Sequence, residues 1–132
     1  MIFWSKYSGI YLILTGVIHN LIGFIMAWPI LLGIHQDGWF NTIESSAGIQ
    51  FDRSAILWFL LVGFFWMLLG YLMHAWLQQL KKPLPNVLGY GFILLGGVTC
   101  ILLPASGAWL FLPQGVVIVL DNFRGIQQRA VA

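Results

Sequence analysis

The chain has 132 residues, of which 60% are hydrophobic and only 8% are charged, and its mean hydropathy is +0.89. A water-soluble domain carries about 25% charged residues, so this composition excludes an ordinary soluble domain. The net charge of +2 comes without a dense basic patch, which excludes nucleic acid as a partner.

Charged residues are missing from three long stretches, residues 7–36, 54–80 and 83–120. About 20 helical residues cross a hydrocarbon core of about 30 Å, and a chain in lipid has to satisfy its backbone internally. The apolar runs are continuous rather than alternating, which predicts helices. We expect an all-α fold, a four-helix transmembrane bundle that forms one integral membrane domain over residues 1–132. The four expected spans cover residues 7–28, 54–77, 87–103 and 106–120.

The distribution of lysine and arginine predicts the orientation. In this topology only Arg53 falls on one side of the membrane, within an outer loop over residues 33–53. Positively charged residues concentrate on the cytoplasmic side, so we expect both termini in the cytoplasm. The residues on that side are Lys6, Lys81, Lys82, Arg124 and Arg129.

Glycines recur seven residues apart in three of the expected spans. Small residues at this spacing let helices approach closely in lipid. Two interpretations stay open, packing inside one bundle and a face for a second copy of the chain or a cavity. Membrane lipids and a homo-oligomer are therefore the expected partners. The stripes are Gly9, Gly16 and Gly23, then Gly63 and Gly70, then Gly89 and Gly96.

Two polar side chains, His19 and Asn20, lie near the middle of the first span. His19 is about 14 Å below the outer end of the helix, and Gln114 in the fourth span is at a similar depth. Polar residues in spans usually face the bundle interior or a water-filled cavity. We expect a ligand-binding layer of His19, Asn20 and Gln114, which the kink expected at Pro113 would open. The alternative is hydrogen bonding between helices, worth about 0.6 kcal/mol per bond.

The outer loop contributes Asp52 and Arg53, which we expect to pair at the mouth of this ligand site, and Asp52 also suits a helix N-cap. The acidic residues and His35 of the loop match no metal-binding spacing, so no metal is expected. His19 and His74 differ in depth by about 14 Å, which argues against a haem held by both. No cofactor is expected.

Four segments carry a resemblance to a known group of proteins. Together they resemble a family of small bacterial four-helix membrane proteins of unknown function, which is similar in size and helix number to DoxX-like proteins. The resemblance implies a multi-pass protein of the bacterial inner membrane and supplies no catalytic residues. The segments are TGVIHN (15–20), DGWFNTI (37–43), DRSAILWFLLVGF (52–64) and SGAWLFLPQG (106–115).

Three functions remain open. We expect a non-catalytic membrane protein that forms oligomers or binds lipid or another ligand. The alternative is a membrane enzyme that acts on a lipidic or quinone-like substrate, with His19 as acid/base catalyst near neutral pH. A small dimeric transporter is the second alternative, although the expected spans lack the carboxylate that proton coupling usually needs.

Overall fold

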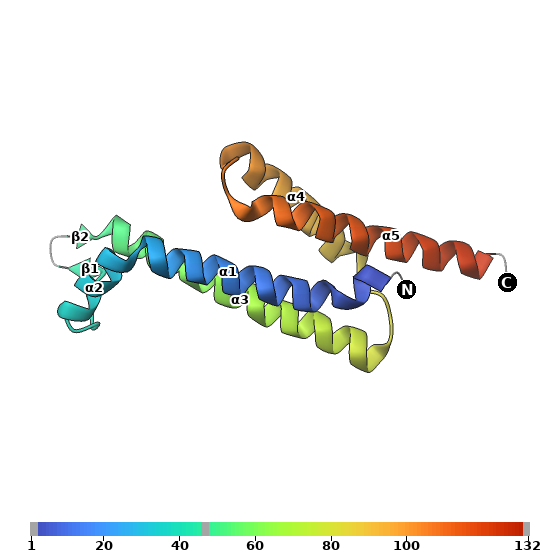
Figure 1. Cartoon of the computed structure of the whole chain (residues 1–132), viewed down its shortest axis with the longest axis horizontal. Coiled ribbons are helices and arrows are strands. Elements are labelled where there is room, and N and C mark those ends of the chain that lie inside the picture. Colours follow the sequence, from blue (N-terminus) through green and yellow to red (C-terminus); the bar gives the residue numbers. More distant parts are fainter. Residues whose placement is uncertain (1–2, 46–47, 131–132) are drawn as a thin grey trace. The chain divides into compact units, whose positions relative to one another are not determined.

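The computed structural model describes residues 3–45 and 48–130, with the side chains of residues 4–44 and 48–124. The chain is all-α in class, as predicted, and carries one small two-stranded ribbon (Figure 1). The elements are η1 (Phe3–Tyr7), α1 (Ser8–Met26), α2 (Trp28–Gln36), β1 (Glu44–Ser45), β2 (Gly48–Ile49), α3 (Phe51–Leu80), α4 (Asn86–Leu102), η2 (Gly107–Leu110) and α5 (Phe111–Ala130).

The chain divides into two compact units. A central unit comprises residues 14–68, and a terminal unit comprises residues 1–13 together with 69–132. The boundary passes through α1 and α3, so one part of each of these helices belongs to the central unit and the other part to the terminal unit. The predicted single domain over 1–132 stays a prediction.

In the central unit, α1 and α3 pack through their glycines. A Cβ atom on Gly16 would lie 2.7 Å from the carbonyl oxygen of Gly63, and one on Gly23 would lie 2.7 Å from the ring of Phe59. Carbon and oxygen atoms cannot approach so closely without displacement, so only glycine permits this helix spacing. The register is antiparallel, because Gly16 lies opposite Gly63 and Gly23 opposite Phe59.

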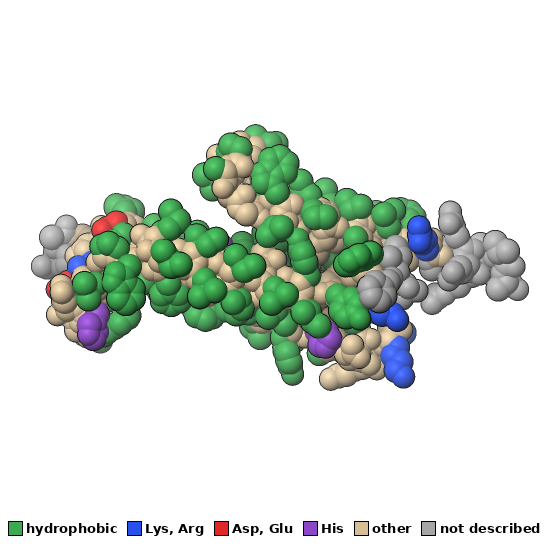
Figure 2. All heavy atoms as spheres, in the orientation of Figure 1, with side chains coloured by type: hydrophobic (Ala, Val, Ile, Leu, Met, Phe, Trp, Pro, Cys, Tyr) green, Lys and Arg blue, Asp and Glu red, His purple; other side chains and the backbone are tan. Residues whose placement is uncertain are grey.

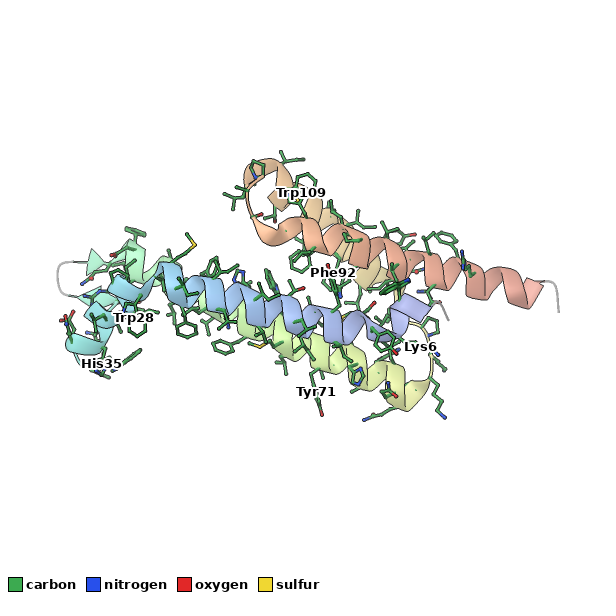
Figure 3. The ribbon with its side chains drawn as sticks, in the orientation of Figure 1. Lys6, Trp28, His35, Tyr71, Phe92 and Trp109 are labelled. Atoms are coloured by element: carbon green, nitrogen blue, oxygen red, sulfur yellow. The ribbon has the colours of Figure 1, made fainter. Side chains whose placement is uncertain are left out.

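The terminal unit repeats this packing. A Cβ atom on Gly9 would lie 2.5 Å from the carbonyl oxygen of Gly70, and one on Gly115 would lie 2.6 Å from that of Gly89. Phe92 of α4 stacks on Phe111 of α5 with ring centroids 5.7 Å apart (Figure 3). The glycine stripes are therefore covered from within each unit, which supports the interpretation as internal packing.

Helix ends follow from local chemistry and correct one expectation. The backbone after α3 turns at Lys81, where φ is +51°, the left-handed conformation that commonly ends a helix. Pro83 and Pro85 follow in the connection to α4. Pro113 is the third residue of α5. Proline is tolerated in the first turn of a helix, so Pro113 is not in the middle of a helix, as the expected span over residues 106–120 had it, and the kink itself stays a prediction.

The expected outer loop, 33–53, holds more regular structure than the sequence predicts. The helix α2 begins after Ala27 with Pro29 in its first turn, a favoured position for proline. The strands β1 and β2 form an antiparallel pair. The amide of Ser54 donates to the carbonyl of Gln50 at 2.9 Å, which marks the start of α3. Asp52 is therefore not the N-cap that we predicted but lies in the first turn, where the helix dipole favours a negative charge.

Two helical stretches of the described chain, Trp4–Met26 and Phe51–Leu80, are long and apolar enough to cross a membrane, and Asn86–Leu102 is a shorter apolar helix. Figure 2 shows apolar side chains covering the visible faces of α1 and α3. Tyr71 of α3 also points outward, away from α1 (Figure 3). The finer prediction of four membrane-crossing helices stays a prediction.

Candidate functional site

His19 of α1 lies against α3 within the central unit. Its Nε2 atom is 2.9 Å from the carbonyl oxygen of Phe59, and its ring stacks on the Phe59 ring at 3.8 Å between centroids and 16° between planes. Trp66 closes the other flank at 4.5 Å. Since a carbonyl oxygen only accepts, the hydrogen must be on Nε2. The imidazole is thus held by one hydrogen bond and two aromatic rings.

Gly63 leaves the space that His19 and Asn20 occupy. A Cβ atom on Gly63 would lie 2.9 Å from Cδ2 of His19 and would clash with the amide oxygen of Asn20. The glycine therefore lets two polar side chains of α1 reach the surface of α3. The structure brings His19, Asn20 and Gly63 together in one place.

Asn20 is a buried polar side chain whose amide is left without hydrogen bonds in the part of the chain that the structure describes. It is only 5% exposed, and neither its Nδ2 nor its Oδ1 atom has a hydrogen-bond partner within the described residues. An amide offers two donor hydrogens and an acceptor oxygen, and leaving a buried polar group unpaired costs about 1–3 kcal/mol. A group that carries a hydroxyl or a carbonyl would satisfy this amide.

Gln114 belongs to the terminal unit. Its Nε2 atom donates to the carbonyl oxygen of Ser8 at 2.9 Å, while its Oε1 atom is buried without a partner among the described residues. His19 and Asn20 belong to the central unit. The layer that we predicted from these three residues therefore stays a prediction.

The sequence reasoning missed a row of hydrogen bonds that join α5, and the last residue of η2 before it, to the N-terminal segment of the terminal unit. Tyr11 donates to the carbonyl of Leu110 at 3.1 Å, and Ser5 donates to the carboxylate of Asp121 at 2.7 Å. The bond from Gln114 to the carbonyl of Ser8 lies between them in chain order. We call these three contacts the α5 seam. In the sequence, the available sign of this row was the spacing of Ser5, Ser8 and Tyr11, which follow one another at intervals of three residues.

Asp121 is the unexpected member of the α5 seam. We placed it beyond the fourth span, but α5 continues to Ala130 and Asp121 is only 3% exposed. Asp121 therefore lies on α5, and its carboxylate is buried rather than exposed to solvent. Its burial is stabilised by the hydroxyl of Ser5.

Arg53 organises the outer segment of the central unit. One terminal nitrogen of its guanidinium donates to the carboxylate of Asp37 at 2.7 Å and the other to the carbonyl of Thr42 at 2.9 Å. These partners differ from Asp52, with which we expected it to pair. Asp52 itself is exposed at the start of α3. A shared role of Asp52 and Arg53 in ligand binding stays a prediction.

Within the described residues, no group of three or more histidine, cysteine, aspartate or glutamate side chains could hold a metal ion. The sulfur of Cys100 is a buried free thiol.

Comparison with known proteins gives a family but no activity. No curated protein and no solved structure matched the chain. A family model described as a family of unknown function, DUF6463, matches residues 4–125. This match covers nearly the whole chain and confirms the predicted resemblance to a small family of unknown function. The chain belongs to the DUF6463 family.

Proposed function

We propose that this protein is a multi-pass protein of the bacterial inner membrane that works without catalysis, by binding lipid or another apolar ligand or by assembling in the membrane. The observation that carries the proposal is an inverted polarity of its helices. Their polar side chains face inward and their large apolar side chains face outward. A helix on the surface of a water-soluble protein has the opposite arrangement.

The helix α1 shows this inversion in the central unit. Thr15 and Asn20 are buried, whereas Leu21 is 56% and Ile25 is 76% exposed. Water disfavours a continuous apolar surface of this kind. A hydrocarbon environment tolerates it, because lipid chains are as apolar as leucine side chains.

The helix α5 shows the same inversion in the terminal unit. Gln114 and Asp121 are buried, while Val116, Leu120 and Phe123 are exposed. This helix was expected to end at residue 120, and its continuation carries the charged residues Asp121 and Arg124, which lower its mean hydropathy. Its inward polar face supports a membrane position for α5, which completes the proposed set of four spans.

The proposed orientation places both termini in the cytoplasm. Lys6, Lys81, Lys82 and Arg124 are exposed, as positive residues that face an aqueous cytoplasm would be. Arg53, the cation proposed to lie outside, is largely buried in its bond to Asp37. The side chain of Arg129 lies outside the described residues.

His19 fits a packing role better than an acid/base role. Its Nε2 hydrogen is engaged by the Phe59 carbonyl, and the ring is covered by Phe59 and Trp66. A catalytic acid or base has to reach the proton it transfers, and this ring would have to leave its partners first. The geometry therefore favours the non-catalytic function over an enzyme that uses His19.

Assembly with a second copy would need faces other than the covered glycines. Gly97 of α4 has open space where a Cβ atom would lie. We propose the face of α4 that carries Gly97 as the glycine-lined face for a homo-oligomer. Ligand binding would use the unpaired amide of Asn20 beside His19.

A buried carboxylate supports a small transporter as the second candidate function. Such a group was the missing requirement for proton coupling, and Asp121 now supplies it within α5. Ionisable residues inside membrane proteins commonly mark ion or proton pathways. Vesicles loaded with a pH-sensitive dye and a panel of cations would show proton movement linked to a cation if this candidate is right.

Two measurements test the main proposal. Membranes washed with alkaline carbonate should retain the protein, because peripheral proteins are released by this treatment. Native mass spectrometry from mild detergent should then show an oligomer or a retained apolar molecule. Release by carbonate would contradict the membrane proposal. A monomer without any bound molecule would contradict the binding and assembly function while leaving the membrane position intact.

A further inference from the structure

The turn after α2, residues 37–43, has an unusual backbone. Gly38, Trp39 and Asn41 all have positive φ angles, of 84°, 68° and 53°. Glycine adopts this left-handed region freely, but a bulky side chain such as that of tryptophan seldom does. The conformation of Trp39 therefore depends on the contacts that hold it.

Two side-chain contacts hold Trp39, since the hydroxyl of Thr42 donates to the carbonyl oxygen of Trp39 at 3.4 Å and the indole of Trp39 meets His35. The Nε1 atom of Trp39 donates to Nδ1 of His35 at 3.0 Å, and the two rings meet edge to face with centroids 6.0 Å apart. His35 is in the last turn of α2, within residues 33–53 (Figure 3). The backbone amide of Trp39 also donates to the carbonyl of Ile34 at 3.2 Å.

The hydrogen on the indole fixes the protonation state of His35. An indole nitrogen only donates, so Nδ1 of His35 must present a lone pair, and the ring must be neutral with its hydrogen on Nε2. A protonated imidazole carries hydrogens on both nitrogens. It cannot accept from Trp39, so protonation of His35 removes this bond.

We propose that the 37–43 turn is a proton-operated latch, in which protonation of His35 releases Trp39 and opens the turn. The latch is closed while the His35 ring is neutral and opens when the ring gains a proton. Trp39 then loses the bond of its indole and keeps only the longer contact from the Thr42 hydroxyl to its backbone carbonyl.

The turn is held at one end by the bond between Trp39 and His35 and at the other end by Arg53, and the charged groups around it act mainly at the Arg53 end. Asp37 and Arg53 face the turn and are bonded to each other at 2.7 Å, so their charges offset one another. Glu44 on β1 directly follows the turn, Asp52 on α3 directly precedes Arg53, and both are exposed. Arg53 also holds Thr42 at the far end of the turn. Acid should therefore release the Trp39 end first and leave the Arg53 end closed. All these groups belong to the central unit, so the latch does not depend on the proposed membrane function.

The test is a pH titration of the full chain in detergent micelles, followed by NMR of the tryptophan indole N–H groups. A Trp39→Phe variant assigns the Trp39 signal among the seven tryptophans. We expect this signal to move to the position of an unbonded indole as pH falls from about 8 to 5. The protection factors of the backbone amides of residues 38–41, which correct for the intrinsic pH dependence of exchange, should fall at least several-fold over the same range.

Two variants decide which group operates the latch. His35→Gln has no titrating ring, so the Trp39 signal should stay at one position across the range, while the other indole signals report that the variant is folded. Asp37→Asn removes the carboxylate but keeps His35, so the titration should persist. The proposal is overturned if His35→Gln leaves the wild-type titration unchanged or if Asp37→Asn abolishes it. A wild-type Trp39 signal that stays fixed while the His35 ring itself titrates would overturn it as well.

Discussion

Gly63 is the residue on which the arrangement of His19 and Asn20 depends. Its missing side chain leaves room for both polar groups on the surface of α3. A substitution that adds one carbon atom there must push the Asn20 amide aside. Gly91 of α4 is a matched control, because a Cβ atom added there meets nothing within 4 Å.

We expect Gly63→Ala to destabilise the protein and Gly91→Ala to be neutral or stabilising. Overpacking a filled site costs about 1–3 kcal/mol, whereas alanine gains about 1 kcal/mol over glycine in a helix. Thermal unfolding of both variants in the same detergent measures the difference. Equal midpoints for the two variants would contradict the close contact between α1 and α3 at Gly63.

Substitutions at His19 separate stacking, hydrogen bonding and catalysis. His19→Phe keeps a ring against Phe59 and loses only the bond to its carbonyl, so we expect a loss near 0.6 kcal/mol. His19→Ala loses the ring as well and should unfold at a clearly lower temperature. If His19→Ala instead keeps full stability and loses a bound ligand or an activity, the result would support the catalytic alternative and contradict the packing role.

Part of this site could be predicted from the sequence. The polarity of His19 and Asn20 in an apolar run marks them as inward-facing, and the seven-residue spacing marks Gly63 as a close-packing position. The partner of His19 could not be predicted, because it is a backbone carbonyl and carries no residue signature. Arg53 shows the same limit, since proximity in sequence suggested Asp52 and the fold supplied Asp37 and Thr42.

At the scale of elements, the α5 seam joins a helix to a chain end that is more than one hundred residues away. Ser5 and Asp121 form its charged contact, and hydrogen bonds to charged groups contribute about 1.5–3 kcal/mol. Removal of either partner should loosen the docking of η1 onto α5. The two residues should therefore be energetically coupled.

A double-mutant cycle tests this coupling. Ser5→Ala and Asp121→Asn should together cost less than the sum of their separate effects, with a coupling energy of about 0.5–3 kcal/mol. Ser106→Ala combined with Asp121→Asn is the control, because Ser106 caps η2 by accepting from the Ala108 amide. Strict additivity for Ser5 and Asp121, measured by unfolding in detergent, would show that the seam contributes nothing.

Two elements differ from the sequence expectation for physical reasons. The helix α5 runs past residue 120, because helical hydrogen bonds depend on the backbone and the burial of Asp121 is compensated by Ser5. The helix α2 begins where the first span was expected to end, at residue 28, because Pro29 favours the first turn of a new helix. The positions of α3 and α4 were predictable, since charges and prolines bound both runs.

At the scale of the whole molecule, the proposed orientation can be read by chemical labelling. In a Cys100→Ser background, a cysteine at Glu44 should react with a membrane-impermeant maleimide in intact cells. A cysteine at Lys81 should react only after the inner membrane is opened. Both native side chains are exposed, so a lack of reaction reports the membrane barrier. Labelling of Lys81→Cys in intact cells would reverse the orientation.

In the membrane position that we propose, the lengths of the helices would require the bilayer to adapt to this protein. At 1.5 Å per residue, the 30 residues of α3 extend about 45 Å, whereas the 17 residues of α4 extend only about 26 Å. A hydrocarbon core of about 30 Å is thinner than the length of α3 and slightly thicker than the length of α4. Such hydrophobic mismatch is relieved by tilting a long helix and by thinning the lipid around a short one. The proposed membrane position therefore predicts that the stability of the fold varies with lipid chain length, with shorter acyl chains favoured beside α4.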